Sequence, residues 1–179
     1  MQDVIVKNST SSTNKKMERI VADKFDESMI LEDVDMFRGS WRNFAGAERP
    51  FNRAGSRNFC IGLTDEYAEE LSKRGYPVKL RKPIDPEDPD IPYVKVFVSY
   101  KIKTPQVMVI TSRGKRNLAE EDLNVLDFAE VSKLDLTIEP YDWNVGEKEG
   151  RKAMVKKMYV TLVEDELDRK YYDVPDMEE

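Results

Sequence analysis

Residues 93–103, Tyr-Val-Lys-Val-Phe-Val-Ser-Tyr-Lys-Ile-Lys, alternate apolar side chains with aromatic, polar and basic ones. Side chains alternate between the two faces of a β-strand, so this pattern predicts a strand with one face in a core and the other in solvent. The second face mixes aromatic rings with cations, a combination that can stack bases and neutralise phosphates. The residues predicted to face the core are Val94, Val96, Val98, Tyr100 and Ile102.

Comparable patterns predict further short strands with two helices between them. Thr64 is suited to cap a helix over 65–74, because acidic residues follow it and Gly75 follows the basic last turn. A second helix is predicted over 118–129, and the strand at 93–103 is expected to form a hairpin with 107–111. The other predicted strands cover 29–37, 57–63, 76–82 at a sheet edge, 134–139 and 153–163.

This order of elements predicts a mostly β fold, a five-stranded barrel elaborated with extra strands and two short helices. A sandwich of two sheets is the alternative. One domain is expected over 28–165, because the chain's 40% hydrophobic content is enough for a single core. The polar, aperiodic segment 1–27 predicts a flexible N-terminus, and 166–179 predict an acidic tail that keeps the protein soluble or contacts partners.

The residue types argue against several kinds of site. The chain has no histidine, which removes Ser-His and Cys-His nucleophiles and the usual zinc ligand. Its one cysteine, Cys60, lies in an apolar run and is expected to be a buried hydrophobe. The acidic loop 85–90 contains prolines that break the ligand spacing of metal-binding loops. We therefore predict no catalysis, no metal and no cofactor.

The net charge of −6 is unevenly distributed along the chain. Residues 38–116 hold 16 basic and 9 acidic side chains, whereas residues 117–179 hold 8 and 18. This asymmetry predicts a basic working surface attached to acidic segments. No apolar run approaches the length of a membrane span, and the first residues lack a signal-peptide pattern, so a soluble cytoplasmic protein is expected.

Three stretches, 41–59, 93–103 and 141–159, place aromatic rings beside cations. Arginine can hold a phosphate with two hydrogen bonds or lie flat on a base. On the last predicted strand, Lys157 and Tyr159 share an outward face with Val155. The candidate nucleic-acid-binding residues are Trp41, Arg42, Phe51, Arg53, Arg57, Lys79, Arg81, Tyr93, Lys95, Phe97, Lys101, Lys103, Arg113, Trp143, Lys157 and Tyr159.

Five short segments together resemble the single-stranded DNA-binding proteins of tailed bacteriophages and prophages, over about residues 29–175. The segments are Asn43-Phe44-Ala45-Gly46, Phe51-Asn52-Arg53-Ala54-Gly55, Arg57-Asn58-Phe59, Ile110-Thr111-Ser112-Arg113-Gly114 and Glu139-Pro140-Tyr141-Asp142-Trp143. The resemblance implies an oligonucleotide-binding (OB) barrel and a non-catalytic role in protecting and organising single strands during phage replication or recombination. The acidic end is similar to the tails with which bacterial single-stranded DNA-binding proteins recruit partners, although it lacks their closing Pro-Phe.

The expected function is therefore sequence-tolerant binding of single-stranded DNA in the cytoplasm of a bacterial host, by a monomer or a small homo-oligomer. Phage or host replication and recombination proteins are the expected partners of the acidic tail, and no membrane is involved. The first alternative is a non-catalytic interaction module, such as a phage inhibitor of a host factor, that uses the same aromatic and basic face. The second is a carboxylate-dependent nuclease with Mg²⁺, which the spacing of the acidic residues disfavours.

Overall fold

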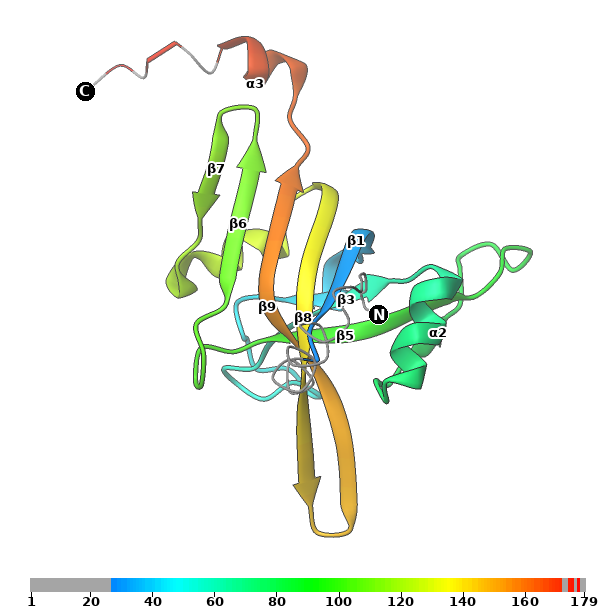
Figure 1. The fold of residues 1–179 in the computed structure, drawn as a ribbon. Coiled ribbons are helices and arrows are strands. Elements are labelled where there is room, and N and C mark those ends of the chain that lie inside the picture. The colour runs from blue at the N-terminus through cyan, green and yellow to red at the C-terminus, as the bar shows by residue number, and fades with distance from the viewer. Residues whose placement is uncertain (1–26, 172–173, 176, 178–179) are drawn as a thin grey trace, which may run out of the picture.

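The computed structural model describes residues 27–171, 174–175 and 177 (Figure 1). The predicted flexible segment 1–27 therefore lies, apart from Glu27, outside the described residues. The strands are β1 (Met29–Met36), β2 (Arg42–Asn43), β3 (Arg57–Gly62), β4 (Lys79–Arg81), β5 (Ile91–Val98), β6 (Gln106–Thr111), β7 (Gly114–Asn117), β8 (Val131–Val145) and β9 (Lys148–Leu162). The helices are α2 (Asp65–Lys73), α3 (Glu166–Tyr171) and the 3₁₀ helices η1 (Gly39–Trp41) and η2 (Glu120–Asp127).

Five strands of a nine-stranded sheet close into a barrel, in the order β5, β3, β1, β8, β9 and back to β5. The neighbours are antiparallel except β5 and β9, which pair in parallel. The predicted five-stranded barrel is therefore confirmed, and the sandwich alternative is wrong. The barrel interior contains the fully buried side chains Leu31, Phe59, Ile61, Val94, Val96 and Ile138.

Helix α2 forms where the sequence predicts it. The hydroxyl oxygen of Thr64 accepts a hydrogen bond from the Tyr67 backbone N–H at 3.2 Å, which satisfies one of the free donors at the helix start. Gly75 ends the helix with a φ of 88°, a conformation that glycine adopts without steric cost. Leu71 and Tyr76 are buried, so the helix and the residues after it close part of the core.

Strand β5 is shorter than predicted and has different neighbours. It ends at Val98, and Ile102, predicted to face the core, is 79% exposed in the following loop. The predicted hairpin between 93–103 and 107–111 is wrong, because β6 pairs with β7 and, in parallel, with β9. Strand β9 thus binds β5 at its middle and β6 further along, while β8 covers its other edge.

A bulge in β9 changes which side of the strand faces the core before Lys157. Thr137 of β8 is opposite Lys157, but the next residue, Ile138, is opposite Val155, so Lys156 is the extra residue. The bulge moves Val155 to the core, where it is 5% exposed, and the prediction that it faces outward is wrong. Alternation resumes after the bulge, with Met158 and Val160 buried.

Three short elements, η2, β4 and α3, lie outside the five barrel strands. The helix predicted over 118–129 is the shorter η2, and its Leu123 and Leu126 are buried. Strand β4 lies at one end of the sheet, as its flanking prolines predict. A short helix, α3, begins the segment for which we predict an acidic tail. Cys60 is 3% exposed, which confirms it as a buried residue, and burial raises the pKa of its thiol.

Candidate nucleic-acid interface

The outward side of β5 and the adjoining β4 carries five of the predicted residues. Val94 and Val96 point into the barrel, so Tyr93, Lys95 and Phe97 point outward. Lys79 on β4 is directly opposite Tyr93 and therefore shares that side, as does Arg81 two residues later. We call this surface the β5 face; its residues are Lys79, Arg81, Tyr93, Lys95 and Phe97.

Trp41 packs against one end of the β5 face. Its ring centroid lies 5.2 Å from that of Tyr93, in an edge-to-face arrangement. The Arg81 guanidinium lies 4.9 Å from the Trp41 ring and 4.4 Å from the ring of Phe37, which is buried beneath. These contacts fix the rings of Trp41 and Tyr93 while leaving part of each exposed. The face therefore presents aromatic rings that are already held in place before any ligand binds.

A long hairpin extends the aromatic and basic surface away from the barrel. Residues 139–154, which we call the arm, are the ends of β8 and β9 that project at the bottom of Figure 1. The Lys152 ammonium lies 4.8 Å from the Phe97 ring centroid, so the arm continues the β5 face. Tyr141 is opposite Lys152, and Trp143 is opposite Gly150 on the same side of the arm.

Gly150 has a steric reason to be glycine. A Cβ built on it would lie 2.6 Å from the Trp143 ring, so the indole lies directly over the Gly150 backbone. The sequence singles out Trp143 but gives no signal for this pairing, which depends on the register of β8 and β9.

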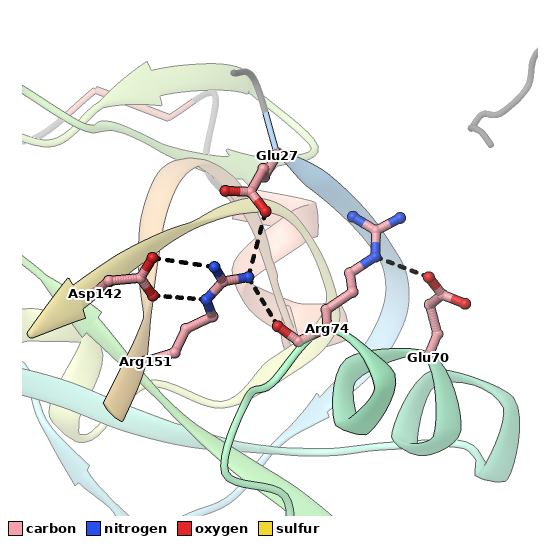
Figure 2. Close-up of polar contacts among 5 residues, drawn as sticks. All are labelled: Glu27, Glu70, Arg74, Asp142 and Arg151. Carbon is pink, nitrogen blue, oxygen red and sulfur yellow. Dashed lines mark hydrogen bonds and ion pairs between the residues drawn. The ribbon is translucent and has the colours of Figure 1, made fainter. Parts of the chain in front are cut away.

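On the opposite side of the arm, Arg151 anchors it to the end of α2 and to Glu27 (Figure 2). Arg151 makes two hydrogen bonds to the Asp142 carboxylate, at 2.7 and 3.0 Å, and donates a third to the carbonyl oxygen of Arg74 at 2.8 Å. It also forms an ion pair with Glu27 at 3.4 Å. Arg74 lies at the end of α2 and is itself bonded to Glu70 (Figure 2). Arg151 is thus committed to positioning the arm.

Replacing Arg151 by Met is expected to loosen the arm and to release Asp142. The hydrogen bond from Arg151 lowers the pKa of the Asp142 carboxyl below its ordinary 3.8. A lowered pKa means that this contact stabilises the fold above the ordinary value and is lost as the pH falls through the lowered one. NMR titration should therefore find the Asp142 pKa back near 3.8 in the variant, with faster amide exchange in the arm. An unchanged pKa and unchanged exchange contradict the anchor.

The loop between β2 and β3 holds an aromatic ring in solvent. In this finger loop, residues 44–56, Phe51 is 100% exposed at the tip. Arg49 and Asn52 exchange both backbone hydrogen bonds around that tip, at 2.9 and 3.0 Å, and Gly55 N–H donates to the Gly46 carbonyl at 2.7 Å. The Phe51 ring therefore has free faces on which a base could stack.

Asparagine side chains shape the finger loop. The Asn52 amide donates to the carbonyl oxygens of Ala47 and Ser56, at 2.9 and 3.1 Å. Asn58, which is 7% exposed, donates to the Asn52 side-chain oxygen at 2.7 Å, and its partner across the sheet is Phe97. The loop is therefore fastened next to the β5 face. The sequence shows these asparagines, but nothing in it assigns them this role.

The other predicted cations near this surface differ in whether they are exposed or already paired with protein groups. Arg53 is exposed on the finger loop, and Lys101 is exposed in the loop after β5. Lys103, in the same loop, pairs with Glu139 of the arm at 3.4 Å. Arg57 is mainly structural: it donates to the Phe44 carbonyl at 2.7 Å, and its ion pair to Glu120 measures 3.6 Å.

Arg42 is an interior residue and does not belong to the interface. It is 2% exposed, and its guanidinium donates to the carbonyl oxygens of Phe37, Leu126 and Ala129 at 2.7 to 3.1 Å. Burial lowers the pKa of Arg42. The prediction that it contacts nucleic acid is therefore wrong, because its donors serve backbone groups at the junction of η1 and η2.

The remaining predicted residues lie apart from the β5 face. Lys157 and Tyr159 point outward from β9 beyond the bulge, where the neighbours are β6 and β8, and the Lys157 ammonium is 5.9 Å from the Tyr159 ring. Arg113 is in the turn between β6 and β7. The preceding residue, Ser112, is hydrogen-bonded to Glu164 at 2.7 Å through both its backbone and its hydroxyl.

Among the described residues, no group of three His, Cys, Asp or Glu side chains is arranged to hold a metal ion. The helices in the part of the chain that the structure describes are all too short or too polar to cross a membrane.

One protein family and several solved structures are similar to this chain. A family model described as "Putative phage ssDNA-binding domain" matches residues 17–179. Among solved structures, the single-stranded DNA-binding protein from bacteriophage Enc34 is similar over 83% of this chain and 91% of that chain, with 8% identity and a TM-score of 0.49. The T7 protein gp2.5, also a single-stranded DNA-binding protein, has 11% identity and a TM-score of 0.35, over 83% and 96%. The curated proteins contain no match.

Proposed function

We propose, because this chain belongs to the family of phage single-stranded DNA-binding domains, that single-stranded DNA lies along the β5 face and continues onto the arm. The observation that carries the proposal is the unbroken sequence of half-exposed rings and cations on this side of the barrel. Trp41 and Tyr93 lie at one end, Phe97 and Lys152 in the middle, and Trp143 on the arm.

Bases are held in this proposal by stacking, and phosphates by charge. Every base offers a flat π-surface, so stacking on Tyr93 and Phe97 is tolerant of sequence and contributes about 1 to 3 kcal/mol per base. Lys79, Arg81, Lys95 and Lys152 lie between or beside the rings, where the backbone would pass. Each phosphate that they neutralise steepens the plot of log affinity against log salt by about 0.7.

The proposed biological role is to protect and organise single strands while phage DNA is replicated or recombined in the host cell. This role is binding without catalysis. The acidic segment from 166 onward would recruit replication or recombination proteins, because its charge is opposite to that of their DNA-contacting surfaces.

Competition between nucleic acids tests the proposal. We expect an oligothymidylate to bind with an affinity that falls as salt rises, with a slope of about −3 for four phosphate contacts. Duplex DNA should compete weakly, because its bases are not available for stacking. Equal competition by duplex DNA, or binding that salt does not change, contradicts the proposal. A stoichiometric host protein partner without any DNA binding would favour the interaction-module alternative.

The proposed path also includes Phe51, because the finger loop is fastened beside Phe97 through the Asn52–Asn58 hydrogen bond. Asn52→Ala is expected to weaken DNA binding about as much as Phe51→Ala. The first change loosens the loop that presents the Phe51 ring to the DNA, and the second removes the ring itself. Each loss should reach about 1 to 3 kcal/mol, and the double variant should be no weaker than the single ones. Fluorescence anisotropy of a labelled oligothymidylate measures all three variants.

Asn124→Ala provides the matched control, since Asn124 is exposed on η2. It should bind like the wild type. Fully additive losses for Asn52 and Phe51 would show that the asparagine does not act through the ring.

A further inference from the structure

A hollow lined by three arginines, two carboxylates and one aromatic ring lies next to Trp41 in the chain. It has a volume of about 390 Å³ and is formed by η1, the finger loop and the end of η2. Its lining includes Arg38, Ser40, Arg49, Phe128 and Glu130. The volume falls in the range of pockets that hold small ligands.

Phe128 is the unusual residue of this hollow. It follows η2 directly and is 93% exposed, whereas Leu123 and Leu126 of the same helix are fully buried. The packing of η2 against the barrel is therefore complete without Phe128. An exposed ring at the rim of a hollow offers a stacking surface of the same kind as Phe51.

The charges around the hollow favour an anion. The Asp127 carboxylate is occupied by the backbone N–H groups of Phe44 and Ala45, at 2.6 and 3.1 Å. Glu130 pairs with Arg38 at 3.8 Å, and the Arg38 side chain remains 73% exposed. Arg49 makes a hydrogen bond to the Ser40 carbonyl at 3.3 Å, and no carboxylate is paired with it among the described residues. An arginine in this position can bind a phosphate.

Helix η1 relates the hollow to the proposed DNA path. Ser40 lines it, and the next residue, Trp41, packs against Tyr93 on the β5 face. A strand that leaves the β5 face over Trp41 would therefore reach Arg49 and Phe128 within the next few nucleotides. The finger loop contributes to both regions, since its Arg49 lines the hollow and its Asn52 is bonded to Asn58, the partner of Phe97 across the sheet.

We infer that this hollow is an additional nucleotide subsite, in which a base stacks on Phe128 and a phosphate binds Arg49 and Arg38. The inference rests on the proposed function and extends the bound strand beyond the β5 face. It follows that short oligonucleotides occupy the β5 face alone, whereas longer ones also occupy the hollow.

A length series separates the two sites. Oligothymidylates of about 4 to 16 nucleotides, a range that covers single OB folds, are titrated against the full chain and Phe128→Ala. We expect the variant to match the wild type on the shortest oligonucleotides that bind. On the longest, it should bind about 5- to 150-fold more weakly, the loss expected for one stacked base. Arg49→Ala should show the same dependence on length.

Val125→Ala is the control, because Val125 is half-exposed on η2 but does not line the hollow. It should bind every length as the wild type does. Equal affinity of Phe128→Ala and wild type at all lengths overturns the subsite and leaves the proposed function intact, and so does an equal loss at all lengths. Failure of the wild type to bind any length overturns both.

Discussion

Phe97→Ala is expected to weaken the binding of an oligothymidylate by about 1 to 3 kcal/mol, the contribution of one stacked base. Phe97 is in the middle of the proposed path, between the β5 face and Lys152 of the arm. Without the ring, the DNA loses one stacking surface. The Lys152 ammonium also loses the ring that positions it for a phosphate contact. Titration by fluorescence anisotropy at one fixed salt concentration measures the effect.

Ile30→Ala is the matched control for this change. Ile30 is a large side chain, 64% exposed, on β1 and away from the β5 face. Its removal should leave DNA affinity unchanged, and Phe97→Trp should retain affinity because it keeps a ring at the site. Wild-type affinity in Phe97→Ala, with the thermal unfolding midpoint also unchanged, would contradict the proposed path.

Arg42→Met is expected to lower the free energy of unfolding by about 3 to 5 kcal/mol, since three acceptors lose their donor and each unsatisfied buried acceptor costs about 1 to 3 kcal/mol. The acceptors are the buried carbonyl oxygens of Phe37 and Leu126 and the partly buried carbonyl oxygen of Ala129. Methionine has a flexible apolar chain that can occupy the space but cannot donate a hydrogen bond. Urea denaturation measures the change through the midpoint and the slope.

Arg53→Met is the matched comparison, because Arg53 is an exposed arginine of the finger loop. It should leave stability unchanged and reduce the salt slope of DNA binding by about 0.7. Unchanged stability in Arg42→Met, together with a reduced salt slope, would show that Arg42 contacts DNA after all.

The barrel strands and α2 could be predicted from sequence because their signals are local. The alternation of Val94, Val96 and Val98 fixes which side of β5 is buried, and Thr64 fixes the start of the helix. The outward rings and cations of β5 follow from the same alternation. This is why Tyr93, Lys95 and Phe97 come together in the structure as the sequence predicts.

The errors arise where distant segments decide the structure. The turn after Val98 looks like a hairpin, but β5 and β6 both pair with β9, which lies some 50 residues later in the sequence. From the sequence, Arg42 resembles an exposed loop arginine. In the fold, η2 packs against it and the Leu126 carbonyl accepts one of its hydrogen bonds. The Lys156 bulge and the Asn52–Asn58 contact likewise depend on register and loop packing. None of these has a local pattern.

Tryptophan fluorescence tests the central claim most directly, because the chain's two tryptophans, Trp41 and Trp143, both lie on the proposed path. The full chain is titrated with an oligothymidylate at two salt concentrations. The account predicts quenching that saturates, in the wild type and in each single-tryptophan variant, and a weaker midpoint at the higher salt. Saturating binding that leaves the fluorescence of both tryptophans unchanged would contradict it.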